Sequence, residues 1–478
     1  AEAFSMHHGV YNQEMYDWFS RAYTPAGPET WNAIRAVDYL ETRPEVDKTK
    51  IGITGRSGGA AMSWFPTAVD PRIKVAVPVM GISTYAANVA ANTQRGHCDC
   101  MFPINHLLHD MMHQGALIAP RPLMMAHGVK DNLFPVPGYT EFEQRVGQLY
   151  KGYGKADAFT NVVVETGHAD SDFLRERAIR WFDRFLLGTP DRKLDMSYSN
   201  EPDETLAVFP GGPPADARNY RVHETFTTRP PSPPFPSLAA WEARRKQLIV
   251  DLKTKVFANL PRAEELGPAH ITVRKAPEGK EGLPGLLYIA SDGEDDRAIN
   301  ATLAQTGNAV RVIVRPIGVG EVPWPKSFWK DTLRNAMHVG QSIDSLRLAH
   351  VMGALETLRR EPGVDPKKIT VMGSGVSGAL GLYAAILDPS IAQVILSYPP
   401  SSHAEGPIFL GIMRYTDLPE AAALLAPRPL VLYARVPPAY EYTRHVYKLC
   451  GKPGNFFRSM HIHRVLEGRL DHNFVSNY

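Results

Sequence analysis

Residues 50–59 read KIGITGRSGG, in which a short apolar run leads through Gly-x-Ser-x-Gly into a helix-like stretch from Gly58 to Val69. Glycines suit such a turn, because larger side chains beside the serine would clash with the backbone. The turn would present Ser57 beyond the end of a strand, and the first N–H groups of the next helix would face an oxyanion. The pattern predicts a nucleophilic serine, with the Gly58 N–H as half of an oxyanion hole. A flexible glycine turn is the alternative interpretation.

Strand and helix patterns alternate around this turn. The strand predicted at 51–54 precedes it, and short apolar runs predict further strands at 75–80, 123–126 and 162–165. Helical patterns follow at 142–150 and 173–187. Alternation at this spacing is typical of a parallel, doubly wound α/β sheet.

An aspartate and a histidine follow two of these strands. Asp131 lies beyond the strand that ends at Ala126, and His168 lies beyond the strand that ends at Glu165. A serine, an aspartate and a histidine in this chain order, each after a strand, predict a catalytic triad. Ser57 would attack a carbonyl, His168 would take its proton, and Asp131 would orient the imidazole. A surface aspartate and an unrelated loop histidine are the alternative.

The sequence contains an internal repeat. Three segments recur in the same order: VDKTKIGITG at 46–55 as VDPKKITVMG at 364–373, Asp-Pro at 70–71 and again at 388–389, and APRPL at 119–123 and again at 426–430. The first two matches lie at an offset of 318 and the third at 307. Three ordered matches predict two tandem copies of one α/β fold.

A proline-rich segment separates the two copies. Nine of the 40 prolines fall between residues 201 and 240, where their fixed φ and missing N–H exclude a helix or a central strand. We therefore expect a first α/β domain at 1–190, a connector at 191–238 and a second α/β domain at 239–478.

The copies differ in length before their shared strand. About 130 residues separate the connector from Ile369, whereas 50 precede Ile51. The first domain is therefore expected to lack its leading strands in this chain, with an upstream segment or a second chain completing its sheet. The second oxyanion-hole donor would then also lie outside this chain, because it normally belongs to a loop after an early strand.

The second copy is expected to be catalytically degenerate. Offset 318 places Gly375 at the nucleophile position, and offset 307 places Pro438 at the acid position. His472 is the candidate for the base position. Glycine and proline cannot perform acyl transfer, so this domain would pack against the first or shape its cleft. Ser374 and Ser377 are the alternative nucleophiles.

A polar loop after the strand at 75–80 is expected to line the substrate cleft. The candidate lining residues are Arg56, His97, Cys98, Asp99 and Cys100. His106, His109 and His113 would share one helical face, which permits a metal site. However, Cys-x-Cys lacks the spacing of structural zinc sites, and three cysteines are too few for a disulfide framework. We expect no metal and no cofactor.

The composition disfavours several classes of protein. The 478 residues carry a net charge of +2 without a long basic block, so electrostatics does not favour nucleic acid or an anionic membrane as a partner. No apolar run approaches the roughly 18 residues that span a bilayer. Hydrophobic residues make up 44% of the chain, which is typical of a globular protein.

With these motifs, and with GHCDCM at 96–101, the sequence resembles bacterial α/β-hydrolases of the acetyl xylan esterase-like and prolyl-oligopeptidase-like groups. The resemblance covers residues 1–190 and, more loosely, the second copy. It implies a serine carboxylesterase that removes acetyl or related groups from a small-molecule or polysaccharide ester, in a secreted or periplasmic location. Gly58 and Ala169 depart from the Gln and Glu that established acetyl xylan esterases carry there. A serine peptidase and a non-catalytic binding or scaffold protein are the alternatives.

Overall fold

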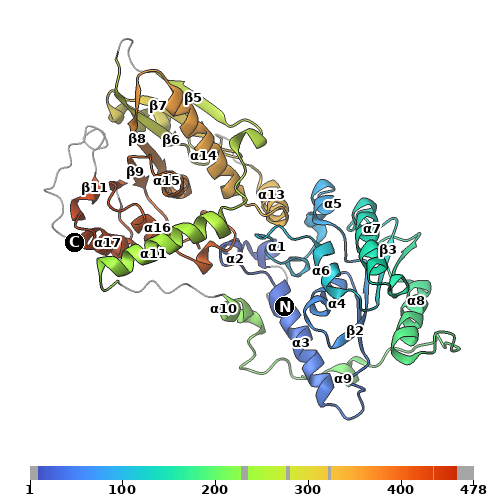
Figure 1. Cartoon of the computed structure of the whole chain (residues 1–478). Helices are drawn as coiled ribbons and strands as arrows, with labels where there is room; N and C mark the ends of the chain where they lie inside the picture. Colours follow the sequence, from blue (N-terminus) through green and yellow to red (C-terminus); the bar gives the residue numbers. More distant parts are fainter. Residues whose placement is uncertain (1–8, 228–234, 276–279, 321–323, 434, 460–478) are drawn as a thin grey trace. The chain divides into compact units, whose positions relative to one another are not determined.

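The structure is a computed structural model that describes residues 9–227, 235–275, 280–320, 324–433 and 435–459. The chain divides into two compact units, which are described separately (Figure 1). The first unit contains residues up to 15 and 23–227, and the second contains 16–22 and the residues from 228 onward. Residues 191–227, which belong to the expected connector, group with the first unit, and helix α2 (Asp17–Ser20) groups with the second.

Four parallel strands form the sheet of the first unit. In spatial order they are β1 (Ile51–Arg56), β2 (Ile73–Val79), β3 (Leu123–Gly128) and β4 (Phe159–Val164). Each strand pairs in parallel with the next, which confirms the predicted α/β class. Because all four run in one direction, the loops that follow them gather at one edge of the sheet.

Helices flank this sheet on both faces (Figure 1). They are α4 (Gly58–Val69), α6 (Met111–Ile118), α7 (Val136–Gly152) and α8 (Asp172–Phe182), the last continuing into the π-helical turn η5 (Asp183–Leu187). Leu174 and Trp181 of α8 pack in one buried cluster with alternate valines of β2. On α4 and α7, the rings of Trp64 and Phe142 meet edge to face, with 5.1 Å between centroids. Successive side chains of the strands point to opposite faces of the sheet, so the strands contribute to a hydrophobic core on each face.

Further helices and short helical turns complete the first unit. They are α1 (Gly9–Gln13), α3 (Ala26–Thr42), α5 (Tyr85–Ala90), η2 (Thr93–Gly96), η3 (Asp99–Met101), η4 (Ala156–Ala158), α9 (Asp203–Leu206), η6 (Asn219–Arg221) and α10 (Val222–Phe226). Among the residues that the structure describes, no helix has both the length and the apolar character needed to cross a bilayer.

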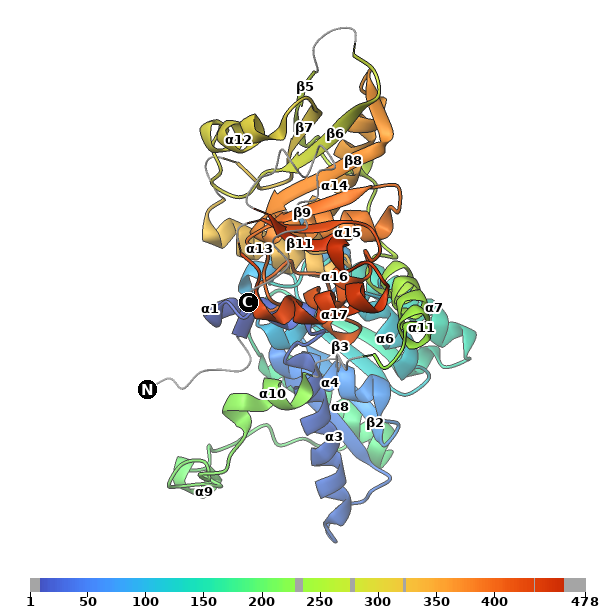
Figure 2. The same cartoon turned by 90° about the vertical axis from the view of Figure 1, so that its left-hand side faces the viewer.

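Seven strands form the sheet of the second unit (Figure 2). In spatial order they are β11 (Phe456–Ser459), β10 (Leu430–Tyr433), β9 (Gln393–Ser397), β8 (Val364–Ser374), β6 (Leu283–Ile289), β7 (Val310–Arg315) and β5 (His270–Arg274). Neighbours are parallel except β5, which runs antiparallel to β7.

The helices of the second unit again occupy both faces of the sheet. They are α11 (Leu238–Asp251), η7 (Leu252–Val256), η8 (Ala263–Glu265), α12 (Asp296–Leu303), η9 (Ala304–Thr306), α13 (Lys326–His338), α14 (Ile343–Arg360), α15 (Gly375–Leu387), η10 (Ile412–Arg414), α16 (Leu418–Ala423), η11 (Pro438–Tyr440), α17 (Glu441–Leu449) and η12 (Pro453–Asn455). Helix α12 contributes to one buried cluster, whereas α11 and α14 to α17 contribute to another, larger one.

The two units repeat a local hydrogen-bond pattern. Arg121 and Arg428, from the two APRPL segments, each donate to three corresponding main-chain carbonyls, and Arg121 also donates to that of Leu117. The acceptors are those of Thr67, Asp70 and Ile73 in the first unit and those of Ala385, Asp388 and Ile391 in the second. Corresponding acceptors lie 318 residues apart, as the sequence repeat does. The first Ala–Pro peptide bond of each APRPL segment is cis, between Ala119 and Pro120 in the first unit and between Ala426 and Pro427 in the second.

Replacing Arg428 by methionine is expected to lower the free energy of unfolding of the second unit by about 2–4 kcal/mol, because several carbonyls lose a charged donor. Burial lowers the pKa of this guanidinium, yet it stays protonated and donates. Urea unfolding of the full chain measures the change. Arg297→Met, on the exposed side of α12, is the control that should change stability little.

The first sheet is the smaller one. Its strands β1 to β4 correspond to β8 to β11, and the described residues contain no partner for the other edge of β1. In the second unit, β8 pairs with β6 at that edge. The described part of the first unit therefore has no counterpart of β5, β6 and β7.

Candidate active site

Ser57 lies in the turn between β1 and α4. Its backbone has φ 58° and ψ −119°, a conformation that residues other than glycine rarely adopt. The Ser57 N–H donates to the Val79 carbonyl at 3.0 Å, and its own carbonyl accepts from the Ala60 N–H at 2.9 Å. Gly58 begins α4, where the first N–H groups have no acceptor within the helix. The turn thus places Ser57 and Gly58 at the edge where the strand loops gather.

Gly55 permits the close approach that this turn requires. A Cβ on Gly55 would lie 2.5 Å from the carbonyl oxygen of Gly59. The second unit keeps the same constraint, since a Cβ on Gly373 would lie 2.8 Å from the backbone of its next helix. Gly375, at the position that matches Ser57, has φ 54°. Both units therefore keep the backbone of the turn, and the first carries a hydroxyl at its apex.

Asp131 and His168 meet between the loops that follow β3 and β4. His168 Nδ1 lies 2.8 Å from Asp131 Oδ2, and the carboxylate is buried whereas the imidazole is partly exposed. The Leu133 N–H donates to the other carboxylate oxygen at 2.9 Å. Two main-chain hydrogen bonds, of 2.9 and 3.0 Å, also join the two loops. An imidazole that donates from Nδ1 has its Nε2 available to accept a proton.

Arg56 connects the serine turn to the histidine loop. Its Nη1 donates to the carbonyl of His168 at 3.0 Å, and its Nε lies 3.2 Å from Asp170 Oδ2. Because Arg56 immediately precedes Ser57, these contacts fasten the backbone of His168 to the backbone of the serine turn. The sequence predicted Arg56 as a cleft-lining residue, and the structure adds this contact between loops.

His97 is buried behind the acid loop, although the sequence predicted it to line the cleft. His97 is only 3% exposed, and its Nε2 lies 2.9 Å from the Leu133 carbonyl oxygen. The rings of His97 and Phe134 stack at 4.8 Å, and Phe134 in turn lies 5.9 Å from the His168 ring. Sequence reasoning missed Phe134, whose position directly after the acid loop was the available signal.

His127 is a second buried histidine near these loops. Its Nδ1 lies 2.8 Å from Asn161 Oδ1 on β4, and its Nε2 lies 2.8 Å from the Ile82 carbonyl after β2. Burial lowers the pKa of His127, which opposes protonation in the folded protein. Both ring nitrogens are engaged, so His127 links β2, β3 and β4 and is not arranged to act as a base.

Cys98 and Cys100 form a disulfide in the loop after β2. Sequence reasoning did not predict it, because three cysteines argued against a disulfide framework. Asp99 between them is buried, and its Oδ2 accepts from the Val10 N–H at 2.9 Å. A Cβ on Gly58 would lie 3.7 Å from Cys100 Sγ and 4.0 Å from Cys98 Sγ. The structure therefore brings both predicted cysteines next to the residue that follows Ser57.

The second unit has different groups at the matching positions. Gly375 begins α15, and Pro438 begins the short turn η11. The hydroxyl of Ser377 is buried and donates to the Ala290 carbonyl at 2.9 Å, whereas Ser374 ends β8. His472 lies outside the described residues.

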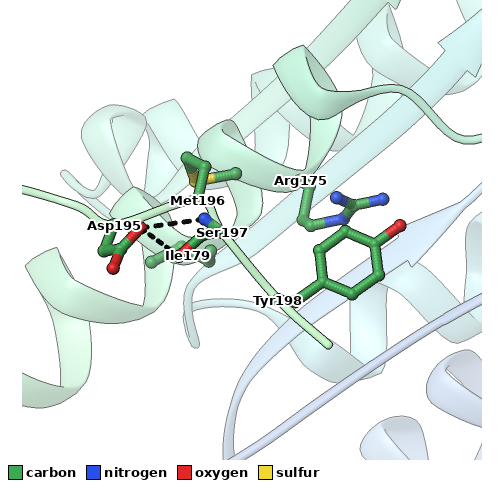
Figure 3. A pocket seen from close by; sticks show the side chains of 6 residues that line it. All are labelled: Arg175, Ile179, Asp195, Met196, Ser197 and Tyr198. Atoms are coloured by element: carbon green, nitrogen blue, oxygen red, sulfur yellow. Dashed lines mark hydrogen bonds between the residues drawn. The ribbon is translucent and has the colours of Figure 1, made fainter. Parts of the chain in front are cut away.

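A cavity of about 370 Å³ lies elsewhere on the first unit, beside α8 (Figure 3). Its lining consists of Arg175, Ile179, Asp195, Met196, Ser197 and Tyr198. The Arg175 guanidinium lies over the Tyr198 ring at 4.8 Å. This cavity contains none of the predicted site residues.

The described residues contain no group of three or more histidine, cysteine or acidic side chains arranged to hold a metal ion. His113, one of the three histidines considered for such a site, instead accepts a hydrogen bond from the Asp110 N–H at the start of α6. The Asp110 side chain accepts from the Met112 N–H in return, so both residues cap the helix.

Residues 34–133 match the family model described as BAAT / Acyl-CoA thioester hydrolase C terminal. This range contains Ser57 and Asp131. A candidate hydrolase, YtaP of Bacillus subtilis (strain 168), is 29% identical over 161 residues, which are 34% of this chain and 54% of YtaP. The chain thus spans about half the length of this curated relative.

Two solved structures are similar at lower identity. A candidate acetyl xylan esterase (BF1801) from Bacteroides fragilis NCTC 9343 is 14% identical with a TM-score of 0.41, covering 57% of this chain and 88% of that protein. A family 15 carbohydrate esterase, the glucuronoyl esterase from Caldicellulosiruptor kristjansonii, is 16% identical with a TM-score of 0.37 and covers 50% of this chain and 89% of that protein.

Proposed function

We propose that the first unit of this chain acts as an α/β-hydrolase and hydrolyses carboxylic esters through an acyl-enzyme on Ser57. The observation that carries the proposal is the 2.8 Å contact between His168 and Asp131, fastened through Arg56 to the turn that holds Ser57. A hydroxyl on a strained turn and a histidine paired with a buried carboxylate are the groups that acyl transfer requires.

In this reaction the Ser57 hydroxyl attacks the ester carbonyl while His168 Nε2 takes its proton. The Gly58 N–H donates to the oxyanion that forms, and Asp131 stabilises the imidazolium. Collapse breaks the bond to the alkoxy group, which leaves as the alcohol with the proton from His168. Water then attacks the acyl-enzyme, His168 again takes a proton, and the carboxylic acid leaves with Ser57 restored.

The substrate class follows from the sequence resemblance, which favours acetyl or related esters of a polysaccharide or of a small molecule. The matching family model is named for acyl-CoA thioesters, whose carbonyl would undergo the same attack. Rates with p-nitrophenyl acetate, an acetylated xylo-oligosaccharide, an acyl-CoA thioester and a peptide anilide therefore separate the candidate substrates. A peptidase would prefer the anilide.

Covalent labelling tests the nucleophile directly. A fluorophosphonate should add one adduct to the full chain, and trypsin should place it on the peptide of residues 57–72. That peptide also contains Ser63, whose hydroxyl donates to the Gly59 carbonyl at 2.8 Å. Ser63→Ala should keep the adduct, and Ser57→Ala should lose it. Absence of an adduct on Ser57 in the unmodified chain would reject the proposal and favour a binding or scaffold protein.

Replacing Arg56 by methionine is expected to lower kcat for p-nitrophenyl acetate about tenfold with a smaller change in KM, because a base displaced by a fraction of an ångström transfers protons less well. Arg56→Lys should recover part of the rate. Asp170→Asn leaves the bond to the His168 carbonyl in place and should cost less than Arg56→Met. A change in KM alone would assign Arg56 to substrate binding rather than to positioning.

A further inference from the structure

The disulfide between Cys98 and Cys100 lies beside Gly58, the first residue of α4. Both sulfur atoms lie within 4.0 Å of the point that a Cβ on Gly58 would occupy. Gly58 directly follows Ser57, and its N–H is the oxyanion donor in the proposed reaction. Any movement of these sulfur atoms therefore changes the space beside the reacting carbonyl.

The chain on either side of the disulfide is anchored. Asp99, between the cysteines, holds the Val10 N–H at 2.9 Å, and His97 before them lies 2.9 Å from the Leu133 carbonyl in the acid loop. After them, the Phe102 carbonyl accepts from the Thr24 hydroxyl at 2.7 Å. These hydrogen bonds hold the loop that carries the two sulfur atoms. Reduction of the disulfide is therefore the chemical change that can move the sulfur atoms within an otherwise anchored loop.

The two cysteines differ in exposure. Cys98 is half-buried, whereas Cys100 is buried with 4% of its surface exposed. We expect a small thiol to attack Cys98, the more exposed of the two residues, and thiol–disulfide exchange requires attack on one sulfur only. Cys450, in the second unit, is a free thiol and offers an internal reference.

We propose that the Cys98–Cys100 pair is a thiol–disulfide exchange site that forms one wall of the acyl pocket, so that reduction by a small dithiol lowers ester hydrolysis. This inference rests on the proposed function. A thiolate of the dithiol attacks Cys98 Sγ, the S–S bond breaks, and Cys100 leaves as a thiolate that takes a proton. The second thiol of the reductant then attacks the mixed disulfide, which releases Cys98 and leaves the reductant as its cyclic disulfide.

Reduction should matter because two free thiols cannot remain at bonding distance. Non-bonded atoms of this size separate to on the order of 3.5–4 Å, so at least one sulfur must move relative to Gly58. A displacement of about 1 Å in a wall beside a reacting centre can cost up to about 100-fold in rate. We expect a loss of about tenfold in kcat/KM for p-nitrophenyl acetate on reduction, recovered on reoxidation.

The experiment uses the full chain before and after treatment with dithiothreitol, with N-ethylmaleimide and peptide mass mapping to count thiols under native conditions. We expect adducts at Cys98 and Cys100 only after reduction, and at Cys450 in both states. Kinetics of p-nitrophenyl acetate hydrolysis are measured on portions of each sample kept free of N-ethylmaleimide and cleared of reductant, and oxidised dithiothreitol should restore the initial rate of the reduced portion.

Variants separate this site from general effects of the reductant. Cys450→Ser should keep the full response to dithiothreitol. The double variant Cys98→Ser, Cys100→Ser should have the rate of the reduced protein and no response. If this variant does not fold, reversible reduction of the unmodified chain still provides the comparison.

Two results would overturn the inference. Absence of new adducts at Cys98 and Cys100 after native reduction would reject the exchange site. Adducts at both cysteines with an unchanged or faster rate of ester hydrolysis would reject the proposal that the pair forms a wall of the acyl pocket. A third result would reject the proposed hydrolase function instead. In that case both cysteines form adducts after reduction, but fluorophosphonate never labels the protein. The two failures can be told apart because the number of N-ethylmaleimide adducts does not depend on catalysis.

Discussion

Replacing Ser57 by alanine is expected to lower the rate of p-nitrophenyl acetate hydrolysis by at least about 10⁴-fold. Without the hydroxyl no acyl-enzyme forms, and the remaining rate comes from binding and the oxyanion donor. Stability should change little, because Ser57 is only half-buried and its turn is held by main-chain bonds to Val79 and Ala60. Steady-state kinetics and thermal unfolding of both proteins measure the two effects.

Ser377→Ala is the matched control in the second unit. The Ser377 hydroxyl donates to the Ala290 carbonyl at 2.9 Å, so it is engaged in the fold and lies away from the apex of its turn, which Gly375 occupies. The rate of the full chain should therefore stay the same. A Ser57→Ala protein with full activity would exclude Ser57 as the nucleophile, and a Ser377→Ala protein without activity would point to the second unit.

Local pattern was enough to predict the segment around Ser57. The helix predicted at 58–69 is α4, and the strand predicted at 51–54 is the first part of β1. Both depend on short-range features, the apolar run and the glycines of the turn. The helix predicted at 142–150 begins earlier, at Val136, because a proline in the first turn needs no N–H partner and does not end a helix there.

Contacts between distant segments could not be predicted in this way. Arg56 and His168 are 112 residues apart in the chain, and their bond depends on how the loops after β1 and β4 meet. The burial of His97 likewise depends on Phe134, which lies on another loop. A polar residue directly before two loop cysteines predicts exposure, and only the packed structure shows that the His97 ring supports the acid loop.

The duplication separates what the fold requires from what the chemistry requires. Both units keep a turn with positive φ, 58° at Ser57 and 54° at Gly375, and both keep an arginine that donates to three corresponding carbonyls. These shared features hold a strand, a helix and a loop together. The hydroxyl of Ser57 and the carboxylate of Asp131 are outside this shared set, which is why they are the positions to test.

Replacing Asp131 by asparagine is expected to lower kcat by about 10⁴-fold with little change in KM. In the native site both carboxylate oxygens accept, one from His168 Nδ1 at 2.8 Å and one from the Leu133 N–H at 2.9 Å. Asparagine has a single acceptor, which the Leu133 N–H would hold. Its NH₂ group then faces His168 Nδ1 and forces that nitrogen to accept, so the imidazole proton moves to Nε2.

A histidine protonated at Nε2 cannot take the proton of Ser57, and this is the reason for the loss. Fluorophosphonate labelling should slow in parallel with kcat, because it needs the same proton transfer. Asp172→Asn is the control, since that carboxylate begins α8 with 86% of its side chain exposed and should leave kcat unchanged. If Asp131→Asn kept kcat within about tenfold of the native value, Asp131 would not be the residue that sets the histidine tautomer.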